Sequence, residues 1–301
     1  MFKRLAYAAI TLFCVITVVF FLVRLAPGGP FDGMRRLPPE VESNLQAAYG
    51  LDKPLVEQYL TYLSNLAQGD LGPSFKQKDF SVNELVARGL PVSAILGTAS
   101  LFIALAIGLA VGMLSGLSPG SRLDSLLMGI SNLNIAIPAI VVAPTMLLVF
   151  SVFLSWFPAG GSDSWLHFVL PVIALALPYS AAIARLTRGG VAESRFEPHL
   201  MTAVSKGLPR RRIILRHLMP IAIIPVLSYL GPAMAGLLTG SVIVEQVFDL
   251  PGIGRYFVQG AMSRDYTLVM GIVIVYSAAI LAFNLLVDLA YAAIDPRVRF
   301  S

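Results

Sequence analysis

Long apolar runs separated by shorter polar segments dominate the chain. A helix needs roughly 20 predominantly apolar residues to cross the hydrocarbon core of a bilayer. Since backbone groups in lipid must be hydrogen-bonded within the segment, unbroken runs of this length predict helices and not the alternating strands of a barrel. The pattern therefore predicts an all-α integral membrane protein whose six spans are Leu5–Val23, Pro91–Leu117, Ser125–Trp156, Leu166–Ala184, Met219–Val244 and Thr267–Val287.

Composition agrees with this fold class and excludes a water-soluble one. Hydrophobic residues make up 56% of the 301 residues and charged residues only 13%, whereas about 25% of the residues in soluble domains are charged. The repeated glycines Gly108, Gly112 and Gly116 predict close packing against a neighbouring helix. Kinks within the runs are predicted at four prolines: Pro138, Pro144, Pro171 and Pro178.

The first run has one feature of a cleaved signal peptide, because Lys3 and Arg4 precede it. It is longer than the apolar core of such a peptide, about 7–15 residues, and no clear cleavage site of small residues follows. We therefore interpret it as the first membrane helix. The single cysteine, Cys14, lies in this run, so the chain has no disulfide framework.

Basic residues predict the orientation in the membrane. With the N-terminus inside, the cytoplasmic segments hold most of the Lys and Arg, including eight between Arg185 and Arg216. Both termini are therefore predicted to be cytoplasmic. The net charge of +5 reflects this orientation, and no nucleic-acid motif is present. Three regions follow: a first helix (1–26), a long outer loop (27–88) and a core of five spans (89–301) with a cytoplasmic loop at 185–217.

The outer loop, Pro27–Arg88, has the composition of an ordered segment. Aromatic and aliphatic residues are frequent in it, which is not typical of disorder. Their spacing from Leu55 onward predicts an amphipathic helix, and Gly69–Ser74 is rich in turn residues. We expect this loop to be a docking and gating element and not a linker.

Catalytic, metal and cofactor chemistry are not predicted for this chain. Its ionisable residues near the apolar runs, Arg24, Arg185, Glu245 and Asp288, fall close to the ends of the runs, so a proton or sodium relay is unsupported. No phosphate-binding loop of the form G-x-x-x-x-G-K-[ST] occurs. Any ATP that drives transport would therefore be hydrolysed by another subunit.

The cytoplasmic loop Arg185–His217 is long enough to carry structure of its own. Gly207 suits the left-handed residue that closes a helix, and Pro209 suits the first turn of the next one. Two short helices meeting at a corner are predicted. Arg210, Arg211 and Arg212 would begin the second helix, where the helix dipole disfavours cations, so they serve something besides local stability. From charge alone, the favoured explanation is their location on the inside of the membrane together with anionic lipid.

The stretch Thr202–Leu208, followed by Pro220, resembles the coupling loop of ATP-binding-cassette importer permeases. Met201 and Thr202 stand where that loop usually has Glu-Ala. Along the rest of the chain, the order of motifs resembles the peptide and nickel branch of this family, and within it the B-type permeases of oligopeptide importers. These motifs are Arg24–Phe31, Gly50–Leu55, Gly69–Phe75, Gly240–Glu245, Phe248–Gly254, Arg264–Tyr266 and Asp295–Arg297.

The resemblance implies the type I importer permease fold in a bacterial inner membrane. It implies a homologous C-type permease, two ATPase subunits that use ATP and Mg, a periplasmic peptide-binding protein and a peptide substrate, besides membrane lipid. The residues that would meet the ATPase are Thr202, Ala203, Lys206, Gly207, Leu208 and Pro209. Candidates for the outer gate or the binding-protein contact are Glu245, Phe248, Pro251, Gly252 and Gly254, the last four in or beside a predicted turn whose glycines take positive φ.

Other functions remain open at this point. The substrate could be a dipeptide or nickel, as in other members of the branch. A scaffold or sensor that docks a soluble partner through the basic loop fits the lack of polar residues at the middle of the membrane equally well. A subunit of an exporter or a channel fits less well, because the coupling-loop pattern resembles importers.

Overall fold

The computed structural model describes residues 2–25, 50–77 and 79–294, and every named element in them is helical. The chain divides into two compact units. Of the described residues, unit 1 comprises those within 94–250 and 280–294, and unit 2 comprises those within 2–93 and 251–279. Among the predicted features, residues 26–49 of the outer loop and the motif Asp295–Arg297 lie outside the described residues.

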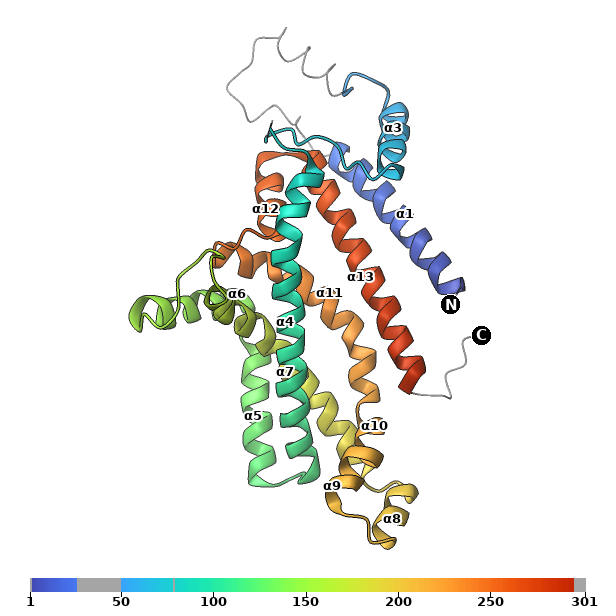
Figure 1. The fold of residues 1–301 in the computed structure, drawn as a ribbon, viewed down its shortest axis with the longest axis vertical. Helices are drawn as coiled ribbons and strands as arrows, with labels where there is room; N and C mark the ends of the chain where they lie inside the picture. Colours follow the sequence, from blue (N-terminus) through green and yellow to red (C-terminus); the bar gives the residue numbers. More distant parts are fainter. Residues whose placement is uncertain (1, 26–49, 78, 295–301) are drawn as a thin grey trace. The chain divides into compact units, whose positions relative to one another are not determined.

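Five helices of the described chain are long and apolar enough to cross a membrane, and they match five of the six predicted runs. They are α1 (Phe2–Leu25), α4 (Val82–Leu117), α7 (Leu166–Ser194), α11 (Ile224–Val247) and α13 (Tyr266–Ile294), which Figure 1 shows in sequence colours. The helix α7 continues well beyond the apolar run that predicted it, which ended at Ala184. Arg185 therefore lies inside a helix and not at its end.

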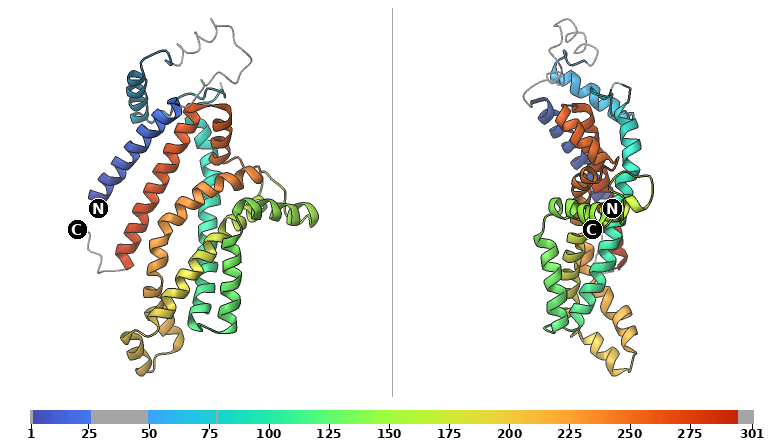
Figure 2. Two further views of the ribbon diagram at one scale, coloured as in Figure 1. Left: turned by 180° about the vertical axis from the view of Figure 1, so that it is seen from behind. Right: turned by 90° about the vertical axis from the view of Figure 1, so that its left-hand side faces the viewer.

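The remaining run, Ser125–Trp156, is not one straight helix as predicted. It forms α5 (Arg122–Ala136), then α6 (Ala139–Met146) and the π-helix η1 (Leu147–Phe153). The two parts are bent by 98°. The bend between α5 and α6 is visible in the ribbon views (Figures 1 and 2). Ile137 is extended (φ −92°, ψ 117°) because Pro138 disfavours a helical residue before it and has no N–H to donate. A sixth span exists only if the bent pair crosses the membrane together.

Unit 1 is built around α7, which packs against α5, α6, α11 and the short α10 (Met219–Ala222). The predicted glycine packing is present between α4 and α7. A Cβ atom at Gly108 would lie 2.7 Å from Cβ of Ile183, and one at Gly116 would lie 2.7 Å from Cβ of Val191. At Gly112 a Cβ atom would meet the carbonyl oxygen of Ala184. Only glycine allows the two helices to approach this closely.

An ion pair between buried Asp124 and partly exposed Arg188 joins α5 to α7. Asp124 is 3% exposed and accepts hydrogen bonds from Nε of Arg188 at 2.6 Å and Nη2 at 2.7 Å. Its two oxygens also accept a hydrogen bond from the Ser115 hydroxyl and one from the Gly120 amide at 2.8 Å. The turn between α4 and α5 is thereby held against α7, and the carboxylate has partners on both oxygens.

Unit 2 contains α1, α3 (Leu55–Ala67), α12 (Ile253–Ser263) and the adjoining ends of α4 and α13. The helix predicted from Leu55 is confirmed by α3. Its Tyr59 and Tyr62 pack against Phe20 of α1, with ring centroids 5.1 and 5.7 Å apart. Val56 and Leu60 of the same helix are exposed. The helix α3 therefore has apolar side chains both at its contact with α1 and on its exposed face.

Candidate functional site

The corner predicted at Gly207 is present between α8 (Pro198–Ser205) and α9 (Arg210–Arg212). Gly207 has φ +68°. Its amide donates to the carbonyl of Val204 at 2.9 Å, and the amide of Leu208 donates to that of Ala203 at 3.3 Å. This pair of bonds closes the end of α8 as a Schellman motif. Pro209 is not in the first turn of α9 but is the residue that precedes it (φ −63°, ψ 140°).

The corner presents a mixed apolar and basic surface. Of the residues predicted to meet the ATPase, Ala203 is buried and Leu208 is half-buried, while the other four are exposed: Thr202, Lys206, Gly207 and Pro209. Met201 and Val204 of α8 are 60% and 61% exposed. A groove of about 730 Å³ runs beside them, lined among others by Arg195 and Arg210. Exposed methionine and arginine around an apolar groove are typical of protein contact surfaces.

The corner is anchored in the interior of unit 1. Leu200 of α8 belongs to a buried cluster with Val191 of α7, Leu218 of the π-helix η2 (Ile213–Leu218) and Ala222 of α10. Met113 and Leu117 of α4 pack against this cluster. Through this cluster α8 is in direct contact with four other elements: α4, α7, η2 and α10.

Two of the residues predicted for the outer gate, Glu245 and Phe248, lie at the end of α11 in unit 1. Glu245 is fully buried and Phe248 is 1% exposed. The chain then turns through Asp249 (φ +51°), and the amide of Leu250 donates to the carbonyl of Glu245 at 2.9 Å. The predicted positive φ values at the glycines are therefore wrong, since the left-handed residue of this turn is Asp249. The buried Glu245 and Phe248 shape the turn from within.

The other three residues predicted for the outer gate, Pro251, Gly252 and Gly254, lie at the start of α12 in unit 2. Gly252 precedes the helix with extended backbone (φ −90°, ψ 171°), and Gly254 lies inside it. Both are buried, whereas Pro251 is half-buried. The amide of Ile253 donates to the hydroxyl of Ser93 on α4 at 2.9 Å. A Cβ atom at Gly89 would lie 2.8 Å from that same amide nitrogen, so this region packs α12 against α4.

Sequence reasoning missed a carboxylate that organises the outer end of unit 2. Asp265 is fully buried directly before α13 and accepts a hydrogen bond from the Ser74 hydroxyl. The carboxylate also accepts hydrogen bonds from the backbone amides of Phe75, Lys76 and Leu268, each at 3.2 Å. The motifs Gly69–Phe75 and Arg264–Tyr266 were both visible in the sequence, but nothing in either indicated that they meet.

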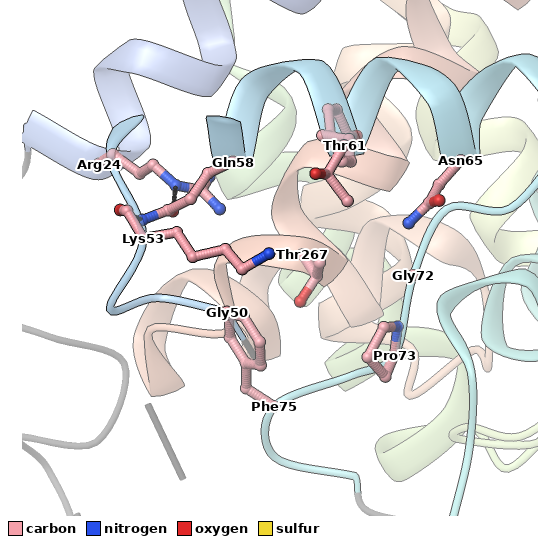
Figure 3. A pocket seen from close by; sticks show the side chains of 11 residues that line it. Arg24, Gly50, Lys53, Gln58, Thr61, Asn65, Gly72, Pro73, Phe75 and Thr267 are labelled. Carbon is pink, nitrogen blue, oxygen red and sulfur yellow. Dashed lines mark hydrogen bonds between the residues drawn. The ribbon is translucent and has the colours of Figure 1, made fainter. Parts of the chain in front are cut away.

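A polar pocket of about 400 Å³ lies beside this carboxylate in unit 2 (Figure 3). Nε of Arg24 donates to Oε1 of Gln58 at 2.8 Å across it. Lys53 forms an ion pair with Glu57 at 2.7 Å, and this hydrogen bond raises the pKa of the lysine. Burial raises the pKa of Tyr62 to about 12, so its hydroxyl stays neutral. The remaining described lining is Gly50, Thr61, Asn65, Gly72, Pro73, Phe75 and Thr267.

No group of three or more His, Cys, Asp or Glu side chains that could hold a metal ion occurs in the described part of the chain.

Sequence comparison places these features in a known context. The family described as "binding-protein-dependent transport system inner membrane component" matches residues 108–300. The chain is 48% identical over 300 residues to the oligopeptide transport system permease protein OppB of Escherichia coli K12, covering 99% of this chain and 98% of the relative. It is 47% identical to OppB of Haemophilus influenzae and 40% identical to the dipeptide permease DppB of Bacillus subtilis, at similar coverage.

Solved structures share the fold. Inward-facing MetNI, a methionine ABC transporter, matches with a TM-score of 0.56 at 19% identity, covering 70% of this chain and 96% of the other. An amino acid ABC transporter with bound histidines also matches with a TM-score of 0.56, at 22% identity over 70% of this chain and 94% of the other. The chain therefore shares its fold with the matched chains of these ABC transporters.

Proposed function

The chain belongs to the family of binding-protein-dependent transport system inner membrane components, and on this premise we propose that it is the permease subunit of an ATP-driven oligopeptide importer. The observation that carries the proposal is the near full-length identity to oligopeptide permeases, which exceeds the identity to dipeptide permeases. The chain is a multi-pass inner-membrane protein without catalytic chemistry of its own.

The partners follow from this role. A homologous C-type permease would complete the pathway, two ATPase subunits would bind ATP and Mg at the cytoplasmic face, and a periplasmic binding protein would deliver the peptide. Both termini would be cytoplasmic, as the distribution of Lys and Arg favours. ATP-driven closure of the ATPase pair would switch the permeases between outward and inward states.

We assign coupling to the corner at Gly207. The exposed side of α8, with Met201 and Val204, would lie in a cleft of the ATPase. Thr202, Lys206, Gly207 and Pro209 would lie at the contact, while Ala203 and Leu208 would hold the corner together. Because Leu200 is packed against α7 and η2, movement of the ATPase would reach the membrane helices without an intervening flexible segment.

For the outer end we propose an indirect role. Glu245, Phe248, Gly252 and Gly254 are buried, so they would set the geometry of the gate and not touch the binding protein. The exposed Asp249 and half-buried Pro251 lie between them and are the part of this turn that a partner could reach.

Uptake by the reconstituted complex tests the proposal. The chain, its C-type partner, the ATPases and the binding protein are placed in proteoliposomes and offered a tetrapeptide, a dipeptide or nickel. Binding-protein-dependent uptake of the tetrapeptide is expected. Uptake of the dipeptide or nickel alone would assign the chain to another member of the branch, and an assembled complex with no uptake would favour the scaffold.

A further inference from the structure

Arg185 is a charged side chain of α7 that directly follows the apolar part of this helix, which continues to Ser194. The side chain is exposed on unit 1, and within the described residues it forms no hydrogen bond or ion pair. Lys and Arg side chains near the ends of membrane helices direct their charges toward the interface, where water is present. The exposed guanidinium of Arg185 is therefore accessible from the aqueous side.

A pocket of about 440 Å³ surrounds this guanidinium. Its lining comes from α7 and α5 and from the turn before α5: Arg185 and Arg188; Asp124, Ser125, Met128 and Asn132; and Gly120. Both oxygens of Asp124 are occupied by hydrogen bonds, including the two from Arg188. Asp124 thus neutralises Arg188, and the charge of Arg185 remains uncompensated in the pocket.

Two uncharged polar side chains of α5 extend this lining along the helix. Ser125 and Asn132 are exposed, and within the described residues their side chains form no hydrogen bond. They lie two turns apart on one face, about 10 Å along the axis. The pocket therefore offers a cation at one point and open amide and hydroxyl groups along one side.

We propose that this pocket, lined by Arg185, Asn132 and Ser125, is a contact site for the peptide on its way through the permease. The guanidinium would receive a peptide carboxylate, and Asn132 would pair with main-chain amide groups, for which it has both a donor and an acceptor. The inference rests on the proposed function and deepens it by assigning residues of the pathway.

The length of the polar lining favours a peptide over an anionic lipid. A lipid phosphate is compact and needs cationic donors at one level of the membrane. The lining here continues along α5 for about 10 Å, the span of roughly three residues of extended chain. Its far end carries the neutral Asn132, which a phosphate does not require.

The test compares Arg185→Gln with Arg122→Gln in the full reconstituted complex. Arg122 is an exposed arginine on the first turn of α5 that does not line the pocket. The substrates are one tripeptide with a free C-terminal carboxylate and the same tripeptide amidated, with binding-protein affinity measured separately for each. For Arg185→Gln, uptake of the free tripeptide should fall about tenfold relative to the amidated one, as expected for loss of a charged hydrogen bond. Arg122→Gln should leave the ratio unchanged.

Equal loss for both tripeptides with Arg185→Gln would overturn the proposal and assign a structural role to the arginine. A change only in the anionic lipid that copurifies would assign the pocket to lipid. If the unsubstituted complex takes up neither tripeptide, the proposed function fails and not this inference.

Cysteine labelling provides a readout that does not require uptake. Cysteines are placed at Ser125 and Asn132 in a chain whose own Cys14 is replaced by alanine. A membrane-impermeant thiol reagent should label both in inverted vesicles, and the tripeptide should slow labelling. Absence of labelling, or labelling that the peptide leaves unchanged, would contradict a place on the pathway.

Discussion

The hydroxyl of Ser74 donates a hydrogen bond to the carboxylate of Asp265, a residue 191 positions later in the chain. Around this bond the loop before α4 is fastened to the start of α13, since the amides of Phe75, Lys76 and Leu268 converge on the same carboxylate. A single buried side chain therefore joins two motifs that the sequence presents as separate. It also fixes Phe75 and Thr267 at the rim of the outer pocket (Figure 3).

Replacing Asp265 should destabilise the outer end of unit 2. Asp265→Ala leaves several buried donors without an acceptor and is expected to lower the free energy of unfolding by about 3 kcal/mol. Ser74→Ala removes the bond to Asp265 and the two bonds that the hydroxyl accepts from the amides of Lys76 and Gln77, and it should cost about 2 kcal/mol. Thermal unfolding of the purified complex and protease cleavage between residues 70 and 77 measure the effect. The exposed Asp52→Asn is the control. Equal stability of Asp265→Ala and this control would contradict the assigned role.

Substitutions at Gly207 should separate backbone strain from steric clash. No atom lies within 4 Å of a Cβ at Gly207, so the cost of a side chain arises from φ +68° alone, about 1–2 kcal/mol for an L-residue. Gly207→Val should abolish uptake while the protein still inserts in the membrane. Gly207→Asn, which tolerates the left-handed region, should retain it.

The matched control for Gly207 is Gly189, which has equal space around its Cβ and no positive φ. Gly189→Ala should be neutral in uptake and in copurification of the ATPases. Normal uptake and assembly of Gly207→Val would exclude this corner as the coupling site.

Two glycines of α4 offer a matched pair for the packing of α4 against α7. Gly112→Ala places a methyl group against Ala184 and Thr187 and should cost about 1–3 kcal/mol. Gly97→Ala, with no atom within 4 Å, should be neutral or slightly stabilising. Melting temperatures of the two variants in detergent provide the comparison, and equal values would show that α4 and α7 are not in close contact there.

The exposed face of α3 should serve the binding protein and not the fold. Val56 and Leu60 are 65% and 59% exposed, one helical turn apart. Changing both to serine should reduce the stimulation of ATP hydrolysis by the binding protein, with basal hydrolysis and melting temperature unchanged. Ser64→Ala on the same helix is the control. Unchanged stimulation in the double variant would locate docking elsewhere, with Asp249 and Pro251 the next candidates.

Local sequence determined the membrane helices and the cytoplasmic corner. Five of the predicted runs became helices that are long enough to span a bilayer, because apolar length is a property of each segment by itself. The left-handed turn at Gly207 could also be predicted from the sequence, because a glycine followed closely by a proline restricts the backbone within a few residues. The helix from Leu55 followed from its spacing of apolar residues for the same reason.

Tertiary structure alone decided what depends on partners distant in the chain. Four features arise only when the helices pack, and no local pattern encodes them. They are the extent of the bend at Pro138, the burial of Glu245, the hydrogen bond from Ser74 to Asp265 and the ion pair of Arg188 with Asp124. Arg185 illustrates the difference, because hydropathy ended the fourth run before it, at Ala184. Packing of α7 against α4, α5 and α11 instead carries that helix on to Ser194 and leaves the arginine within it, facing an open pocket.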